Sequence, residues 1–334
     1  MLHFLKDNSL TKVQQIAKGI ALDIERGFLK KDMQLPSINE FNKIYKVARE
    51  TVEKAYKILK DEGYIVSVAS KGYYVSGKSS KTLKVLLVFN KLSSYKKIVY
   101  DNLIKSLGEQ ATVELRIHHY SPKLFKEIVE EALGKYHYYL IMPHFLKNTP
   151  QEEYIEVLKQ IPFNQLILLD KNVPELKGDF GAVFQNFKED IYTALIKAIP
   201  LLKKYRGIKI IFPSFSNHPV EILEGISKFC QEQKKRFIIL EQIEPKQLKS
   251  GYAYIVIADA DLANLIKQSK EANLQIGKDV GIISFNETIL KEILNITVVT
   301  TDFEHIGREA ASYIMTNNFQ QTRSPFSLIT RGSL

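Results

Sequence analysis

The chain has 334 residues, of which 45% are hydrophobic and 25% charged, a globular composition that is long enough for two domains. No apolar run approaches the roughly 20 residues of a membrane span, the start MLHFLKDNSLTK lacks a secretory signal, and a lone cysteine, Cys230, excludes an internal disulfide. The net charge is +10, and residues 1–81 hold 15 Lys and Arg against 9 Asp and Glu, which favours a polyanionic partner for that part. We expect a cytoplasmic protein without membrane contact, metal or cofactor.

Two capping boxes mark helix starts in the first part of the chain. Thr11 with Gln14 precedes an apolar stripe of helical spacing, and Ser37 with Glu40 opens a shorter helix. The segment ARETVEKAYKILKDEG, residues 48–63, reads as a third helix that ends at a glycine.

Two short β-rich runs, 64–68 and 73–76, flank a turn at 70–72 and predict a hairpin. Three helices followed by a hairpin make a winged helix-turn-helix, which we assign to residues 1–76. The small, polar and basic stretch GKSSKT, residues 77–82, is the expected linker.

The start of the third helix carries polar side chains on the face opposite its apolar stripe. A major groove admits one α-helix, and side chains near its N-terminus reach base edges. Arg49 suits a guanine or a phosphate, Thr51 a phosphate or a thymine methyl, and the hairpin tip suits the DNA backbone or minor groove. The expected contacts here are Arg49, Glu50, Thr51, Lys54, Lys71 and Gly72. The alternative is a three-helix domain whose charged face is merely solvated.

The run GFLKKDMQLPSINEFNKIYKVARETVEKAYKILKDEGYIVSVASKGYYV resembles the DNA-binding domain of GntR-type bacterial transcription regulators. The LPS step, the V-A-R-x-T-V helix start, L-x-x-E-G and the wing carry the resemblance. It implies that Arg49, Thr51 and the wing contact operator DNA. Ser37 and Asn39 complete the predicted DNA contacts, with Asn39 in place of an arginine that this family often has.

From Leu83 onward, short apolar strands alternate with amphipathic helices. The expected strands are 83–89, 112–120, 138–142, 165–170, 208–213, 236–241, 253–258 and 280–285. The expected helices are 96–109, 123–135, 151–161, 190–205, 218–233, 261–274 and 304–317. Such alternation predicts parallel sheets covered on both faces, here as two α/β lobes within residues 83–334.

Ligands of parallel sheets bind beyond the carboxyl ends of the strands. These ends carry amides, carboxylates, imidazoles and aromatic rings, which suit the hydroxyl groups and C–H faces of a sugar. The expected effector contacts are Phe89, Asn90, Tyr95, His144, Asp170, Phe215, Asn217, His218, Asp259 and Asn286. An alternative role for Asp259 is the N-cap of the next helix. His118 and His119, expected on one strand, would face opposite sides and could not share a metal.

The end of the chain, with GKDVGIISFNE, ITVVTTDFEHIGREAASYIM and SLITRGSL, resembles the sensor domains of lactose-repressor-type regulators, which have a periplasmic-binding-protein-like fold. This resemblance implies a sugar effector between the lobes. Asn286 stands where the family has a carboxylate that holds sugar hydroxyls, and Asp259 and Asp170 match two family acids. Ile222 stands where the family has an arginine, for which Asn217 or His218 could substitute.

P-loop, G-x-S-x-G, G-x-G-x-x-G and H-E-x-x-H motifs are absent from the sequence, so we expect no enzyme. The prediction is a dimeric transcription regulator that represses a carbohydrate-utilisation operon and is controlled by a monosaccharide or its derivative. One alternative is a DNA-binding protein whose α/β domain only dimerises or binds a non-sugar ligand. Another is an enzyme or sugar-binding module with a DNA-binding head.

Overall fold

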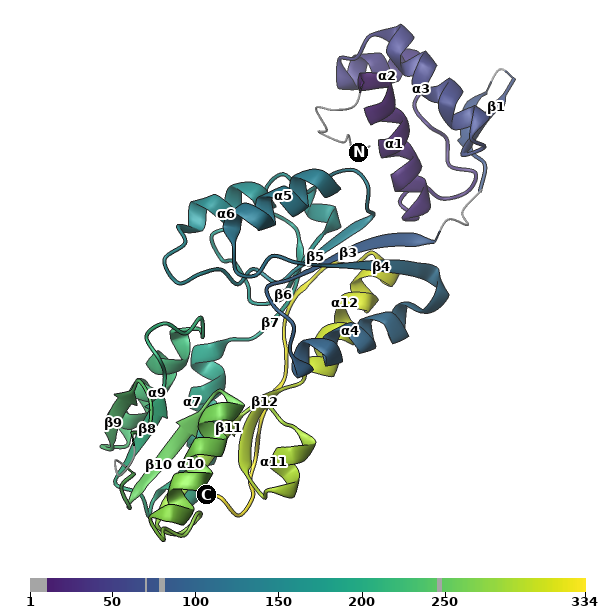
Figure 1. Cartoon of the computed structure of the whole chain (residues 1–334). Coiled ribbons are helices and arrows are strands. Elements are labelled where there is room, and N and C mark those ends of the chain that lie inside the picture. Colours follow the sequence, from purple (N-terminus) through teal and green to yellow (C-terminus); the bar gives the residue numbers. More distant parts are fainter. Residues whose placement is uncertain (1–10, 70, 78–81, 245–247) are drawn as a thin grey trace.

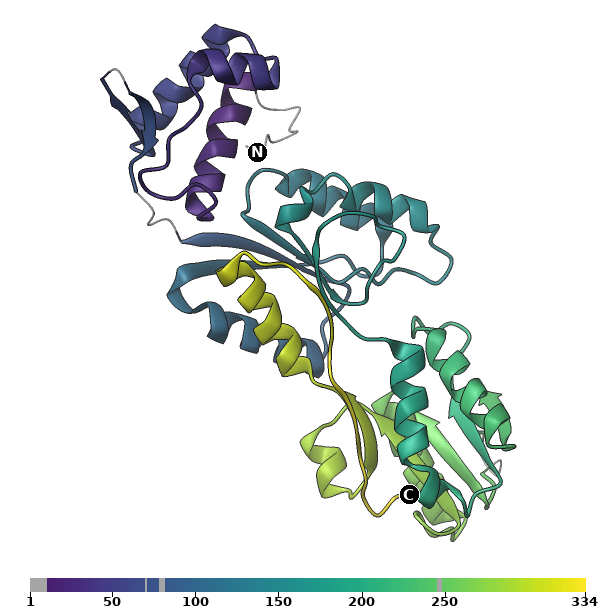
Figure 2. The same ribbon diagram turned by 180° about the vertical axis from the view of Figure 1, so that it is seen from behind.

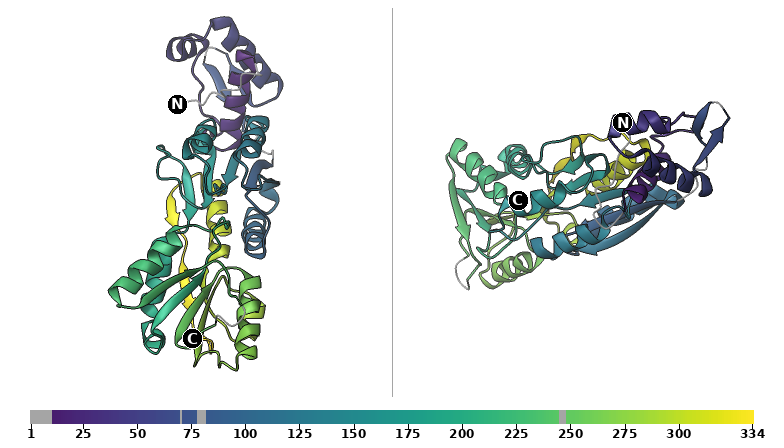
Figure 3. Two further views of the ribbon diagram at one scale, coloured as in Figure 1. Left: turned by 60° about the vertical axis from the view of Figure 1, so that its left-hand side comes forward. Right: turned by 90° about the horizontal axis from the view of Figure 1, so that it is seen from above.

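The computed structural model describes residues 11–69, 71–77, 82–244 and 248–334. The chain forms a small N-terminal head, an N-terminal lobe and a C-terminal lobe, arranged end to end in that order (Figures 1, 2 and 3). Across these residues, none of the helices combines the length and apolar character that a membrane span requires. The limits 1–76, 77–82 and 83–334 stay a prediction, and residues 78–81 of the expected linker lie outside the described part.

The head is a winged helix-turn-helix, as predicted. Its elements are α1 (Lys12–Glu25), α2 (Ile38–Tyr45), α3 (Arg49–Asp61), β1 (Ile65–Val68) and β2 (Gly72–Val75). Both capping boxes are present, with Thr11 and Ser37 as the N-caps of α1 and α2. Phe41, Val52 and Tyr56 are fully buried where the helices meet, so the apolar stripe of α3 faces inward and leaves its polar face outside.

The N-terminal lobe is a six-stranded parallel sheet with helices on both faces, in the strand order β13-β7-β6-β5-β3-β4. Helices α5 and α6 cover one face, and α4 and α12 cover the other (Figure 1). Its strands are β3 (Leu83–Phe89), β4 (Ala111–Ile117), β5 (Tyr138–Ile141), β6 (Leu166–Asp170), β7 (Gly181–Phe184) and β13 (Gln321–Arg323). Its helices are α4 (Ser94–Leu107), α5 (Pro122–Ala132), α6 (Gln151–Leu158) and α12 (Phe303–Thr316).

The C-terminal lobe has a second six-stranded sheet, in the order β14-β12-β11-β10-β8-β9, parallel except for β14. Its strands are β8 (Gly207–Ile211), β9 (Arg236–Leu240), β10 (Tyr252–Val256), β11 (Val280–Phe285), β12 (Thr297–Thr301) and β14 (Phe326–Ile329). Its helices are α7 (Phe187–Lys197), α8 (Ile199–Leu202), α9 (Glu221–Glu232), α10 (Asp259–Glu271) and α11 (Ile289–Ile293). Cys230 is buried in its core.

The chain crosses between the lobes near residues 185–187, 301–303 and 324–325, and these crossings form the hinge (Figure 2). The sequence predicts that the last long helix belongs to the second half of the alternation. Instead, α12 returns to the N-terminal lobe and packs on α4. The lobes are therefore built from chain segments that interleave.

Short elements and one strand end differ from the prediction. The elements β7, α11, β12, β13 and β14 are not expected from the sequence, and the helix expected over 190–205 is divided into α7 and α8. The strand expected over 112–120 ends at Ile117, and His118 and His119 lie in the turn after it. His118 is buried and His119 is exposed, as expected, although not because of strand alternation.

The contact between α12 and α4 depends on Gly307. A Cβ atom at this position would lie 2.4 Å from the backbone oxygen of Val99 and 2.9 Å from the backbone nitrogen of Leu103. Backbone atoms cannot rotate out of the way as the end of a flexible side chain can. The two helices can therefore approach this closely only with glycine at the crossing.

We expect Gly307→Ala to lower the free energy of unfolding by about 1–3 kcal/mol, because the added methyl group must push α12 away from α4. Urea denaturation followed by circular dichroism measures the change. Ser312→Ala, at an exposed position of the same helix, is the control. Equal stability of the two variants would show that the helix crossing is not close-packed.

Candidate functional site

The outward end of α3 has the chemistry of a DNA contact. Arg49 is the first residue of the helix, and its N-cap, Ala48, provides no side-chain acceptor. The amides of Thr51 and Val52 donate to the carbonyl oxygen of Ala48, whereas those of Arg49 and Glu50 precede the first intrahelical acceptor and suit an anion. Arg49, Glu50 and Lys54 are exposed, and Thr51 is half-buried. Lys54 forms an ion pair with Glu50, with a separation of 2.8 Å between Nζ and Oε1.

The other predicted DNA contacts lie on α2 and on the wing. Ser37 uses its hydroxyl oxygen to accept the amide of Glu40 at 3.2 Å, so this residue also has a structural task. Asn39 is exposed on α2. The wing tip is held by Gln34, whose Nε2 donates to the carbonyl oxygen of Lys71 at 2.7 Å. Lys71 is exposed, next to the half-buried Gly72.

The head contacts the N-terminal lobe through the end of α1. Arg26 is 7% exposed, and its Nη2 donates to the carbonyl oxygens of His137 at 2.6 Å and Asn164 at 3.2 Å. Its guanidinium lies 4.9 Å from the ring centroid of Tyr138. Beside it, Nε2 of His137 is 2.6 Å from Oε2 of Glu25, and both side chains are buried. Charged groups thus join the head to the lobe at a desolvated interface.

A cavity of about 250 Å³ opens at the hinge between the lobes, at the carboxyl ends of strands from both sheets. Eight of the ten predicted effector contacts line it: Asn90, Tyr95, His144, Asp170, Asn217, His218, Asp259 and Asn286. The rule that ligands bind beyond the strand ends therefore selects residues that the fold brings together, although they come from distant parts of the chain.

Two predicted effector contacts are wrong as lining residues. Phe89 is 1% exposed and packs in the core of the N-terminal lobe, because it is the last residue of β3 and its side chain points inside. Phe215 is 86% exposed in the loop after β8 and lies outside the cavity. Tyr95 does provide an aromatic face in the cavity, next to Phe303 at 4.9 Å between ring centroids.

Asp170 is the buried acid of the N-terminal wall, and its backbone has a φ of +71°. Its Oδ2 lies 2.8 Å from Nε2 of His144, and its Oδ1 accepts from Nε2 of Gln185. Burial opposes ionisation, but the bonds from His144 and Gln185 and the charge of Lys96 hold the pKa of Asp170 at about 2. Burial lowers the pKa of His144, so a neutral imidazole donates to the carboxylate.

Gln185 extends this network to the hinge. It follows β7, where the chain leaves the N-terminal lobe, and its Oε1 accepts from the hydroxyl of Thr301 at the second crossing. At the third crossing, the amide of Ser324 donates to the carbonyl of Phe184 at 2.7 Å. The side chain that holds Asp170 therefore also connects two strands of the hinge.

The C-terminal wall is held by two ion pairs. Nζ of Lys291 lies 2.9 Å from Oδ1 of Asp259, and Lys291 also donates to the backbone oxygens of Phe285 and Asn286. Asp259 is the first residue of α10 and Ala258 is the N-cap, so the alternative role of Asp259 as a cap is wrong.

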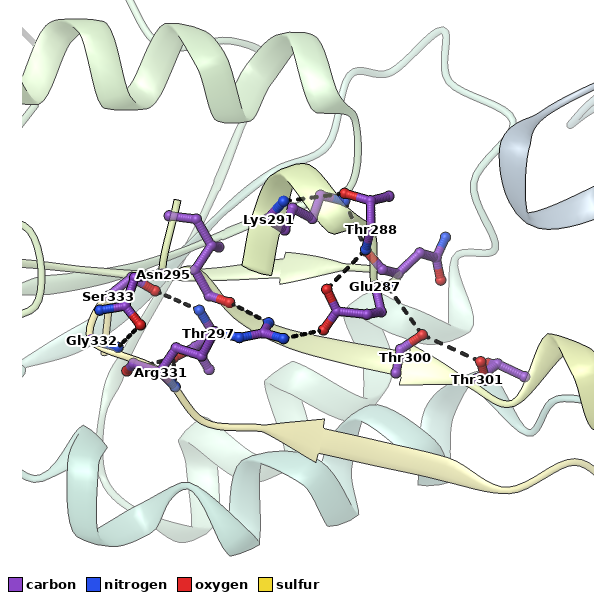
Figure 4. Close-up of polar contacts among 12 residues, drawn as sticks. Glu287, Thr288, Lys291, Asn295, Thr297, Thr300, Thr301, Arg331, Gly332 and Ser333 are labelled. Carbon is purple, nitrogen blue, oxygen red and sulfur yellow. Dashed lines mark hydrogen bonds and ion pairs between the residues drawn. The ribbon is translucent and has the colours of Figure 1, made fainter. Parts of the chain in front are cut away.

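Glu287 belongs to the second ion pair of this wall. It lies 2.8 Å from Nη2 of Arg331, and its amide donates to the hydroxyl of Thr300 at 3.1 Å (Figure 4). Arg331 in turn donates to the carbonyl oxygen of Ile296 at 2.9 Å. The last residues of the chain thus hold the loop that carries Asn286 into the cavity.

Sequence reasoning missed several lining residues, above all Lys91, Lys96, Gln185 and Lys291. Lysines within helical patterns are normally solvated, so composition gave no reason to place them in a cavity. Lys96 and Lys291 are 2% and 3% exposed. The signal that could have found these two lysines is position, because Lys96 and Lys291 follow the predicted strand ends at Phe89 and Phe285 by seven and six residues.

Residues 12–75 match the gntR family of bacterial regulatory proteins, and residues 214–334 match the periplasmic binding protein-like domain. The chain joins a GntR-type DNA-binding domain to a periplasmic-binding-protein-like domain. The first match covers the head, and the second covers most of the C-terminal lobe together with α12, which packs on the N-terminal lobe.

Among curated proteins, the chain is 30% identical over 124 residues to the HTH-type transcriptional regulator TreR of Bacillus subtilis, covering 37% of this chain and 48% of that protein. The chain spans between a third and a half of the length of the curated relatives it matches.

Solved structures of the same fold include the following two. The trehalose repressor from Escherichia coli has a TM-score of 0.59 and 16% identity, with 75% of this chain and all of that chain covered. A LacI family regulator from Enterococcus faecium with bound ribose has a TM-score of 0.58 and 16% identity, with 75% and 98% covered.

We expect Asp170→Asn to flatten the loss of stability in acid. Because the pKa of Asp170 falls from 3.8 to about 2 on folding, its ionised form stabilises the fold above pH 4 by roughly 2 kcal/mol. This stabilisation disappears as the pH falls from 4 towards 2.

Urea denaturation at a series of pH values compares Asp170→Asn with the exposed control Asp61→Asn. The first variant should be less stable at pH 7 and lose less stability between pH 4 and 2. An acid profile identical to that of the control would show that Asp170 has no depressed pKa.

Proposed function

We propose that this protein is a ligand-responsive repressor of a carbohydrate-utilisation operon, in which a small sugar or sugar derivative in the interlobe cavity changes the affinity of the head for operator DNA. The observation that carries the proposal is the polar cavity at the hinge, lined from both lobes, on a chain whose head presents α3 outward. The trehalose-repressor and ribose-bound relatives support a sugar as the ligand class.

In this proposal the ligand acts by binding one lobe angle better than another. His144 and Asp170 would bind it from the N-terminal wall, and Asp259 and Asn286 from the opposite wall. The link from Asp170 through Gln185 to the hinge supports this coupling, because it joins the ligand site to the strands that must bend. A coupling of ~1–3 kcal/mol would change operator affinity roughly 5- to 150-fold.

The head would follow the N-terminal lobe during such a change. The buried contacts of Arg26, and the pairing of Glu25 with His137, support movement of these two parts as one body. A change in lobe angle within a dimer would then alter the separation of the two recognition helices. The proposed operator is a pseudo-palindrome whose half-site spacing fits one of the two states.

The test begins with selection of an operator from random-sequence DNA by the purified protein. Fluorescence anisotropy then measures its affinity with and without each member of a sugar panel. Arg49→Ala should weaken operator binding by ~1–3 kcal/mol, because a base or phosphate contact is lost, and leave sugar binding unchanged. Arg308→Ala, an exposed arginine on α12, is the charge-matched control.

Equal operator affinity with and without every sugar that binds would contradict the regulatory part of the proposal. Undiminished operator binding by Arg49→Ala would contradict the assignment of α3 as the recognition helix.

We propose further that the protein acts as a homodimer through α11. Four large apolar side chains of this helix and its end are more than half exposed: Ile289, Leu290, Ile293 and Leu294. Such a cluster is unusual on a free surface. It lies on the same side of the molecule as α4, whose Ile98 is also exposed (Figures 1 and 2). A second copy related by a two-fold axis could cover both surfaces at once.

Ile293→Glu should weaken dimerisation by about tenfold to a hundredfold, because a charge would be buried in an apolar interface. Sedimentation equilibrium measures the dissociation constant. Ile239→Glu, the same change at an exposed position of the edge strand β9, is the control. Loss of the dimer in the control alone would assign the interface to β9 instead.

A further inference from the structure

The carboxylates of the cavity are already matched by groups of the protein. Asp259 pairs with Lys291, and Glu287 pairs with Arg331, at 2.9 and 2.8 Å. Asp170 accepts from His144 and Gln185. None of these acids therefore requires a cation from the ligand.

Lys96 on α4 is in a different situation. Its side chain is 2% exposed, and Nζ contacts three neutral groups of the described residues. These are Oδ1 of Asn90, the sulfur of Met142 at 3.2 Å and the ring of Phe89, whose centroid lies 5.6 Å away. No carboxylate in the described residues lies within 4 Å of it, and Asp170 acts on it only through space. Burial lowers the pKa of Lys96 to about 8, so at pH 7 the ammonium is still charged. A buried cation with neutral partners is costly.

Two further groups give the same wall a positive potential. Lys91 is half-buried at the edge of the cavity, and no ion pair is found for it in the part of the chain that the structure describes. The amides of Ser94 and Tyr95 belong to the first turn of α4, before the helix supplies intrahelical acceptors, and both residues line the cavity. The N-terminal wall therefore presents cations and N–H donors in excess of acids.

We propose that the effector is an anionic sugar, carrying a phosphate or carboxylate group that binds between Lys91, Lys96 and the first turn of α4. This inference rests on the proposed function, because it assigns the class of ligand for the same cavity. His144, Asp259 and Asn286 are then left for the sugar hydroxyls. A neutral sugar would remove water from the ammonium of Lys96 without giving it an ionic partner. An anionic group would instead accept a charge-assisted hydrogen bond from this ammonium, which would offset the loss of water.

Matched pairs of ligands test the proposal. The probes are glucose, fructose, ribose and trehalose, each beside its monophosphate, together with glucuronate and inorganic phosphate, all at one ionic strength. Thermal unfolding detects binding, and calorimetry gives the dissociation constants. At least one phosphate or carboxylate derivative should bind roughly tenfold to a hundredfold more tightly than its neutral parent.

Lys96→Met is the informative variant, because methionine fills the space without a charge. It should remove the preference for the anionic derivative, because the anion then has no ammonium at this position to pair with. Lys97→Met, at the exposed neighbouring position, is the control and should keep the preference. If Lys96→Met does not fold, Lys91→Ala and the comparison of ligand pairs on the native protein still decide the matter.

A neutral sugar that binds as tightly as its anionic derivatives, with no effect of Lys96→Met, would overturn the anionic class and leave the proposed function intact. An equal shift from inorganic phosphate alone would overturn it as well, because no sugar would be recognised. Binding of no probe in either class would contradict both this inference and sugar control of the protein.

Discussion

The buried carboxylate of Asp170 is the group on which the geometry of the cavity depends. An ionised acid removed from water needs donors on every side, and here they come from the loop after β5, from the hinge and, through space, from α4. The requirement fixes the imidazole of His144 and the amide of Gln185 in one orientation each. Gln185 also accepts from the hydroxyl of Thr301. One side chain therefore both stabilises the buried carboxylate and connects two of the strands that cross between the lobes.

This arrangement explains why the interleaved chain matters. The helix α12 begins at Phe303, two residues after Thr301 at the hinge, and packs on α4, the helix that carries Lys96. In the proposed switch, a bend at the crossing would move a helix that packs on the cavity wall. In this switch, no series of intervening residues is needed to couple the ligand to the hinge, because the crossing strands, Asp170 and the basic wall are direct neighbours. What a ligand changes is the relative free energy of lobe angles.

Sequence reasoning succeeded where a local rule determines the structure. The capping boxes at Thr11 and Ser37 and the apolar strands follow from contacts over a few residues. The rule of ligand binding at strand ends needs only the fold class, and it selects eight residues that line the cavity. Sequence reasoning failed where tertiary structure decides. Phe89 is the last residue of its strand, and its ring packs in the core. Lys96 lines the cavity although its helix has an ordinary amphipathic pattern. The helix α12 packs on the first lobe, and the spacing of its apolar residues does not show which lobe it joins.

The contact between the head and the N-terminal lobe also affects how such proteins can be recombined. Glu25 and Arg26 belong to the head, whereas His137, Tyr138 and Asn164 belong to the lobe. A hybrid that joins another head at the linker would replace one half of a matched set and leave the other half buried with new neighbours. A hybrid with a new operator specificity would therefore need the end of α1 and the residues around the start of β5 to come from the same parent protein.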